Sequence, residues 1–183
     1  LVITDNAVAS MNTKIDELIL KAINTSTQTV TGANTSGMTL DVVQAIWEHF
    51  QVNHIFRNKE LPIVNVGAKQ WNQLMNLKQF YHADVITAAQ LPYLFTKAES
   101  GRFWMDMVWR VDPDLPAGEG STTKCNAFVK SCVGLALGGI DKTRVRETDD
   151  DTILYYMRRK LGAVLIDETG ALSFDVANSQ ASS

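Results

Sequence analysis

The sequence is short of cysteine, with two in 183 residues, and this excludes a fold held together by a disulfide framework. Cys125 and Cys132 stand seven positions apart in one apolar segment, which is not the paired spacing of a zinc site. We therefore predict that both are buried free thiols and that the protein works in a reducing compartment.

Long apolar runs are also missing. No run approaches the roughly 20 residues that a membrane-spanning helix needs, and the first residues lack the basic and apolar regions of a signal peptide. A formal net charge of -3 and a pI of about 5.6 give no general attraction to nucleic acid or to anionic membranes. We expect a soluble protein that is intracellular at synthesis and has no membrane partner.

Metal-binding patterns are absent as well. His49 and His54 are five positions apart, which puts them on different sides of a helix, and neither they nor His82 form an HExxH motif. The acidic run from Asp149 to Asp151 lacks the later ligands and the central glycine of a calcium-binding EF-hand loop. We predict partly buried, hydrogen-bonded histidines, a solvated acidic turn and no metal site.

The sequence also lacks the patterns of a catalytic or cofactor site. Cys125 and Cys132 have apolar neighbours, which oppose the thiolate that a nucleophilic cysteine needs. Gly134, Gly138 and Gly139 form neither a GxGxxG nor a Walker A sequence, and no Lys-Ser/Thr pair follows them. We predict no catalytic residue and no cofactor, with a small α+β enzyme of unrecognised site as an alternative.

What the chain does contain is the composition of a globular protein, with 45% apolar and 20% charged residues. Its 183 residues suffice for one domain with a buried core, or for one compact domain with an appendage. Apolar residues spaced by three and four predict helices at 4–24, 40–52 with Thr39 as the N-cap, and 68–77. Alternating or β-branched runs predict strands at 61–66, 102–111, 125–129, 143–147 and 152–167.

Three connecting segments have less regular patterns. Residues 131–137 are too short a run for periodicity to distinguish a buried helix from a continued strand. The polar residues 25–36 predict an exposed loop that links subdomains. We expect residues 171–176 to return after the turn at 167–170 as a terminal hairpin.

Positive charge is concentrated in one part of the sequence, at Arg144, Arg146, Arg158, Arg159 and Lys160. Arg144 and Arg146 alternate along a predicted strand, so they point to one side of a sheet. An acidic run lies between the two basic groups, at Asp149, Asp150 and Asp151. We predict that these eight residues make subunit contacts through ion pairs. The alternatives are a solvated face, paired within the chain to Glu147 and the acidic run, and contact with nucleic acid.

Several segments together point to a known family: Asp16–Ile19 with the polar loop after it, Ile63–Val66 followed by Trp71, Cys125–Phe128 leading into Val133–Ala136, and Leu161–Asp167 before a terminal strand. With these segments, the sequence from about Asp5 to Val176 resembles the C-terminal portion of the major capsid proteins of tailed bacteriophages. That family has the Hong Kong 97-type fold.

The resemblance implies an α+β fold with two lobes. A peripheral domain, with a long spine helix and long paired strands, would comprise residues 1–38 and 138–177. An axial domain, a sheet flanked by helices, would comprise residues 39–137, and residues 178–183 would be a disordered tail.

The resemblance also implies a function without catalysis. The chain would be a shell subunit that assembles into hexamers and pentamers of an icosahedral head around double-stranded DNA. Scaffolding, portal or decoration proteins and non-specific contact with packaged DNA are implied partners, and the virion, after assembly in the host cytoplasm, is the implied location. An encapsulin-like shell around protein cargo is the alternative.

The family's N-terminal arm and extended loop, which precede the spine helix, have no counterpart in this sequence. The sequence also begins at Leu1 and not at Met. We therefore expect either a mature form cleaved from a longer precursor or an excerpt of one.

Overall fold

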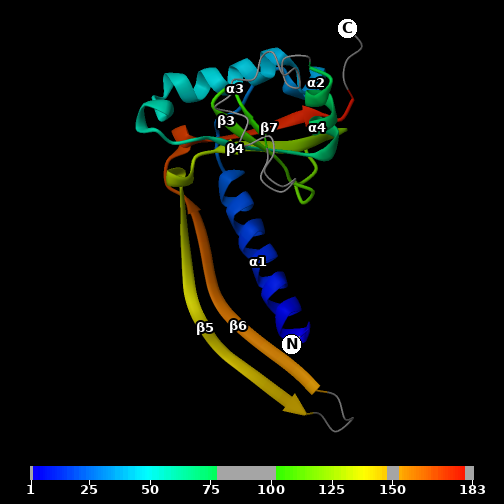
Figure 1. Ribbon diagram of the computed structural model, residues 1–183, viewed down its shortest axis with the longest axis vertical. Helices are drawn as coiled ribbons and strands as arrows, with labels where there is room; N and C mark the ends of the chain where they lie inside the picture. The colour runs from blue at the N-terminus through cyan, green and yellow to red at the C-terminus, as the bar shows by residue number, and fades with distance from the viewer. Residues whose placement is uncertain (1, 78–101, 148–152, 180–183) are drawn as a thin grey trace.

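The computed structural model describes residues 2–77, 102–147 and 153–179. The chain is a mixed α+β protein, as the sequence predicted, and a sheet with helices packed on it forms its body. Helix α1 (Val2–Ile23) and a two-stranded ribbon project together from this body (Figure 1). The ribbon consists of β5 (Val133–Glu147) and β6 (Ile153–Leu165).

The body is built on a five-stranded sheet with the strand order β2-β3-β1-β4-β7. Strands β1 and β3 run parallel, whereas the other neighbouring pairs are antiparallel. The strands are β1 (Ile63–Val66), β2 (Arg102–Trp104), β3 (Met107–Val111), β4 (Thr122–Phe128) and β7 (Ala171–Ala177). The predicted strands at 61–66 and 125–129 are thus confirmed, with shifted ends.

Helix α3 (Leu40–Val52) lies over the sheet (Figure 1) and matches the predicted helix at both ends. Its spacing places Ile46 and Phe50 on one face, and both are fully buried in the core. The hydroxyl of Thr39 accepts a hydrogen bond from the backbone N–H of Val42, so the predicted N-cap is confirmed. A short 3-10 helix, η1 (Ile55–Asn58), follows.

Helix α4 (Ala68–Met75) packs a polar side chain into the body. The amide of Gln73 donates from Nε2 to the carbonyl of Ala177 at 3.0 Å, and its Oε1 accepts from the backbone N–H of Met38 at 2.8 Å. Gln73 is buried, so these two bonds satisfy backbone groups that water does not reach. One side chain therefore ties the end of β7 to the segment before α3.

The predicted single strand at 102–111 is wrong, because the structure divides it into a hairpin. Strands β2 and β3 pair with each other across a two-residue turn at Met105 and Asp106, whose φ angles are 50° and 58°. Such turns favour asparagine and glycine, which tolerate a positive φ, so the sequence carried no turn signal here. Alternation of side chains continues on both sides of the turn and hides it.

The predicted terminal hairpin is also wrong. Strand β7 pairs along its whole length with β4, from Thr122 opposite Ala177 to Phe128 opposite Ala171, and not with β6. All but one of its seven residues are buried. A strand of this kind is stable within a sheet that is covered on both faces, and the projecting ribbon offers no such cover.

The polar segment 25–36 is only partly the exposed loop that the sequence predicted. The backbone N–H of Ser173 in β7 donates to the carbonyl of Gln28 at 3.0 Å, and a short helix α2 (Ala33–Ser36) packs beside β7. Ala33 is fully buried. The segment therefore covers the edge of the sheet, because an uncovered strand edge presents unpaired backbone groups.

The first residue of the predicted disordered tail, Asn178, is bonded to the body. Oδ1 of Asn178 accepts hydrogen bonds from Gln70 Nε2 at 3.0 Å and from Thr123 Oγ1 at 2.8 Å. Residue 178 is thus fixed to the body, and residues 180–183 lie outside the described residues.

The remaining predicted helices and strands are confirmed in type. Helix α1 (Val2–Ile23) confirms the helix predicted at 4–24 with shifted ends, and β6 corresponds to the long strand predicted at 152–167. The ambiguous run at 131–137 is a short 3-10 helix, η5 (Lys130–Cys132), that leads into β5. Among the residues that the structure describes, no helix is both long enough and apolar enough to span a membrane.

Candidate subunit-contact surface

The base of the ribbon is fixed firmly to the body. The backbone N–H of Ile166 donates to the carbonyl of Cys132 at 2.7 Å, and the N–H of Val129 donates to the carbonyl of Gly170 at 3.0 Å. Gly170 ends the short 3-10 helix η6 (Glu168–Gly170), which joins β6 to β7. These bonds set the direction in which the ribbon leaves the sheet.

Replacing Gly170 by alanine is expected to lower the free energy of unfolding by about 1–3 kcal/mol, because overpacking a filled site displaces its neighbours. A Cβ at this position would lie 2.8 Å from Cys132 Cβ and 2.9 Å from Val129 Cγ2. Urea unfolding measures the loss. Gly162→Ala is the matched control, because a Cβ there meets no atom within 4 Å. Equal stability of the two variants would contradict the tight packing at the base.

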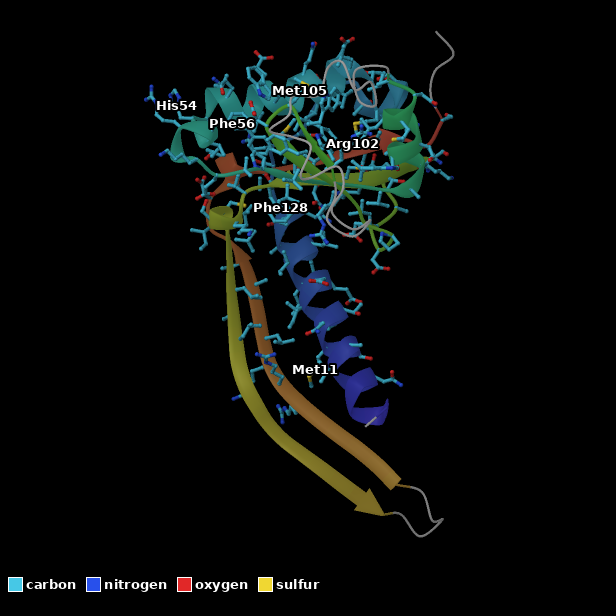
Figure 2. All side chains as sticks on the ribbon, in the orientation of Figure 1. Met11, His54, Phe56, Arg102, Met105 and Phe128 are labelled. Atoms are coloured by element: carbon cyan, nitrogen blue, oxygen red, sulfur yellow. The ribbon has the colours of Figure 1, made fainter. Side chains whose placement is uncertain are left out.

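The two faces of the ribbon have different surroundings. Along β6, residues 159, 161, 163 and 165 are half-buried, whereas 158, 160, 162 and 164 are exposed. Helix α1 runs along β6, and Figure 2 shows Met11 on the side of α1 that faces the ribbon. We call the half-buried side the inner face and the opposite side the outer face. Alternation assigns each position of β6, and of β5 as far as Leu137, to one of the two faces.

Aliphatic side chains of the ribbon base are exposed on both faces. Leu135 and Leu137 on the inner face are 39% and 47% exposed, and Val164 and Ile166 on the outer side are 61% and 69% exposed. Single exposed leucines are common, but two exposed aliphatic side chains on each face make the ribbon base a candidate interaction surface. Sequence reasoning missed these four residues, because alternation does not show which face a partner element covers.

The ribbon bends at an irregularity in β5. The register shifts between Leu137 and Ile140 and again between Ile140 and Lys142, so β5 carries two more residues than β6 in the paired stretch. Bulges of this kind increase the bend and twist of a strand, and Figure 1 shows the ribbon curving along its length. The side chain of Arg159 donates from Nε to the carbonyl of Gly138 at 2.8 Å, which holds the bend.

The structure separates the basic residues that the sequence grouped together. Arg158 and Lys160 are exposed on the outer face, whereas Arg159 lies on the inner face and is half-buried. Within the described part of the chain, neither Arg158 nor Lys160 has an ion-pair partner. The register places position 144 opposite Tyr156 and position 146 opposite Leu154.

The structure gives no information on the acidic run. Asp149, Asp150 and Asp151 lie outside the described residues. The contact role of the eight charged residues therefore stays a prediction.

The histidines and cysteines do not form a reactive centre in the described ranges. His49 Nε2 lies 3.0 Å from the carbonyl oxygen of Thr169, which confirms a hydrogen-bonded role, whereas His54 is exposed, contrary to the prediction. His82 lies outside the described residues. In the part of the chain that is described, no three His, Cys, Asp or Glu side chains gather as metal ligands would.

Both cysteines are buried free thiols, as predicted. Burial raises the pKa of Cys125 to about 12 and the negative charge of Asp175 adds to the shift, against a hydrogen bond from the backbone of Gly67. Burial also raises the pKa of Cys132 to about 11. Both side chains therefore stay protonated at neutral pH, which does not suit a nucleophile.

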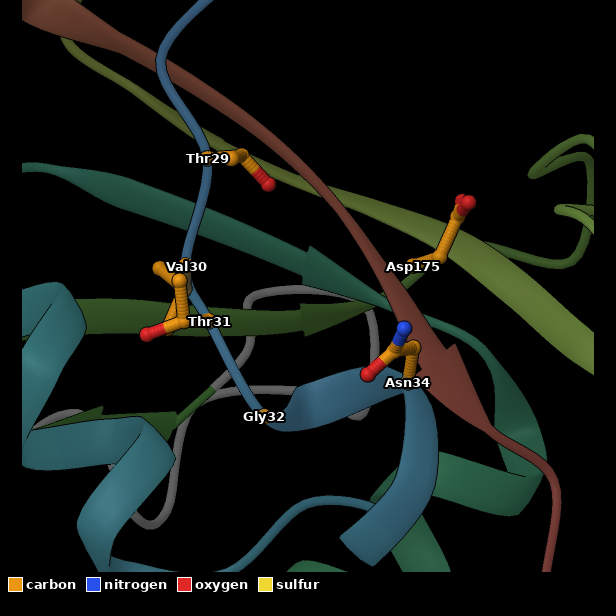
Figure 3. A pocket seen from close by; sticks show the side chains of 6 residues that line it. All are labelled: Thr29, Val30, Thr31, Gly32, Asn34 and Asp175. Atoms are coloured by element: carbon orange, nitrogen blue, oxygen red, sulfur yellow. The ribbon is translucent and has the colours of Figure 1, made fainter.

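Two hollows are open on the described surface. The first holds about 280 Å³ beside β7, and Figure 3 shows its lining. Its residues are Thr29, Val30, Thr31, Gly32, Asn34 and Asp175. The second, which we call the α1 groove, holds about 420 Å³ between α1 and the sheet, and its walls include Ile19, Ile63, Val111 and Phe128.

Comparison with known proteins gave one family match. A family model described as "Phage capsid protein" matches residues 2–177. No curated protein matches the sequence.

Among solved structures, a chain of Mycobacterium phage Che8 is similar, with a TM-score of 0.67 and 17% identity over 94% of this chain and 61% of that one. A capsid chain of an empty gene transfer agent particle gives a TM-score of 0.52 and 12% identity, over 85% and 55% of the two chains. An encapsulin chain of Synechococcus elongatus gives 0.46 and 13%, over 75% and 51%. This chain thus spans 61% of the length of the Che8 chain, and at 17% identity the likeness shows a shared fold.

Proposed function

Because the chain belongs to the phage capsid protein family, we propose that it is a structural subunit of an icosahedral phage head. The subunits form hexamers and pentamers that close around double-stranded DNA. The family and the fold imply a structural protein and not a catalyst. The buried, protonated cysteines agree with this proposal.

The observation that carries the proposal is the ribbon itself. It projects from the body with aliphatic side chains exposed on both faces, at Leu135, Leu137, Val164 and Ile166. No backbone hydrogen bond within the described residues pairs the outer edge of β5 or β6 with a further strand. A monomer would leave this surface in water, whereas neighbouring subunits would cover it.

We also propose a division into two lobes. A peripheral lobe holds α1 and the ribbon, and an axial lobe holds the sheet with α3 and α4, close to the expected domains 1–38 with 138–177 and 39–137. The pairing of β7 with β4 supports moving residues 171–177 to the axial lobe. The lobes would divide the contacts, with the axial lobe around the capsomer axis and the peripheral lobe toward neighbouring subunits.

The mechanism of such a subunit is mechanical. Each square ångström of apolar surface that becomes buried between subunits contributes about 25 cal/mol, before the cost of association is subtracted. Scaffolding, portal or decoration proteins are proposed partners, and the virion, after assembly in the host cytoplasm, is the proposed location.

Electron microscopy of the full-length protein tests the proposal. We expect closed shells or isolated hexamers and pentamers, because the exposed ribbon needs partners. A protein that stays a monodisperse monomer at high concentration would contradict it. Double-stranded DNA inside the particles supports a phage head, whereas protein cargo inside them would identify a compartment shell.

A further inference from the structure

The lining of the α1 groove combines acidic with apolar side chains. Its lining carries the carboxylates of Asp16, Glu17, Asp112 and Asp114 and the cations of Arg110 and Lys130, so carboxylates outnumber cations by two. The side chain of Glu17 is already paired with Lys14. Asp16 and Asp114 are exposed and have no ion-pair partner within the described ranges.

The outer face of the ribbon has the complementary pattern. Val164 and Ile166 are exposed near its base, and Arg158 and Lys160 follow further along β6. Within the described residues, neither Arg158 nor Lys160 has an ion-pair partner, so an anionic partner would neutralise both.

The two surfaces do not meet within one chain. Helix α1, which forms one wall of the groove, lies against the inner face of the ribbon, so the outer face points away from it. A contact between the two surfaces would therefore join two copies. Because it would join two different patches of the same chain, it would be heterologous, and such contacts close into rings when the rotation from one copy to the next closes.

We propose that the outer face of the ribbon in one copy docks in the α1 groove of a second copy. Arg158 and Lys160 then face the carboxylates of Asp112 and Asp114, and Val164 packs against the apolar residues that line the groove. This inference rests on the proposed function, because it names the contact by which shell subunits join.

A nucleic-acid backbone is the other polyanion to which the basic residues could bind. Phosphates would neutralise Arg158 and Lys160 but would offer nothing against which Val164 and Ile166 can pack. The combination of a basic stretch with a neighbouring aliphatic pair favours a protein surface that carries both carboxylates and apolar side chains. The acidic, part-apolar groove is such a surface.

Charge reversal in the full-length protein tests this contact. R158E/K160E and D112K/D114K are each expected to reduce the yield of assembled particles at least about tenfold, because like charges then face each other across the contact. Combining all four changes restores opposite charges and is expected to recover most of the yield. Gradient sedimentation and electron microscopy measure the assembled fraction.

The matched control reverses carboxylates elsewhere on the body. Asp41 and Glu48 are exposed on α3 and do not line the groove, so D41K/E48K is expected to assemble like the wild type. The neutral variant R158Q/K160Q adds no new charge and is expected to lower the yield less. R158Q/K160Q takes the place of R158E/K160E in the test if circular dichroism shows that R158E/K160E is unfolded.

Disulfide trapping gives a second readout that does not require closed shells. K160C/D114C is expected to form a ladder of linked multimers under oxidising conditions on a non-reducing gel. K160C/E48C is the control that stays monomeric. The native thiols at Cys125 and Cys132 are buried, so they do not add background.

The outcomes separate this inference from the proposed function. The contact would be overturned if the wild type forms shells, the quadruple variant R158E/K160E/D112K/D114K assembles no better than either double variant, and K160C/D114C forms no ladder. That result would leave the shell function in place. If R158E/K160E assembles normally but its particles hold less DNA, the proposed contact would also be overturned, and the outer face of the ribbon would be assigned to nucleic-acid binding. A wild type that forms no shells, together with a K160C/D114C variant that forms no ladder, would contradict both.

Discussion

Replacing Trp109 by alanine is expected to lower the free energy of unfolding by about 3–5 kcal/mol, the usual range for emptying a buried tryptophan site. Trp109 is fully buried in β3, near the centre of the sheet, and its ring lies 6.0 Å from that of Trp104. Its Nε1 donates to the backbone carbonyl of Trp104 at 3.1 Å. The substitution therefore leaves a cavity and removes a buried hydrogen bond. Equilibrium unfolding in urea measures the effect.

Trp109→Phe separates the two contributions, because it keeps a ring in the site and loses the indole N–H. We expect a smaller loss of about 1–2 kcal/mol. Val52→Ala is the control, because Val52 is 67% exposed and its truncation should change stability by no more than about 0.5 kcal/mol. A loss at Trp109→Ala no larger than this control would show that the site is not a packed core.

The second large effect is expected at Gln73, whose amide joins two distant backbone groups. Gln73→Met keeps the length of the side chain but leaves the N–H of Met38 without its partner and weakens the bonding of the Ala177 carbonyl. That carbonyl retains a long contact of 3.4 Å from Gln70 Nε2. Because burying an unpaired polar group costs about 1–3 kcal/mol, we expect a total loss of about 2–4 kcal/mol.

Gln51→Met is the matched control, since Gln51 is exposed on α3 and the same change there should be nearly neutral. Hydrogen exchange adds a local readout. The amide of Met38 is expected to exchange faster in Gln73→Met, because its acceptor is gone. Unchanged protection of that amide, with an unchanged unfolding midpoint, would contradict a stabilising role for the two hydrogen bonds of Gln73.

Elements whose signal lies within one stretch of sequence were predictable. Helix α3 was predicted from its apolar stripe and from Thr39, because capping and periodicity act between residues a few positions apart. The hairpin at Met105 was not, because alternation passes through a two-residue turn and the turn residues are atypical. The candidate site was predictable only as a basic stretch of sequence, without the aliphatic residues beside it.

The sequence by itself determined the amphipathic α1 and α3 and the long strand β6, since each depends on local periodicity, and its family resemblance predicted the α+β class. Only the tertiary structure decided that β7 joins β4 and that α1 covers one face of the ribbon. It also brought Asp16 and Asp112, which are nearly a hundred positions apart in the sequence, into the lining of the same groove. These outcomes depend on which distant surfaces bury each other, and that choice is made by packing over the whole chain and not by any single segment.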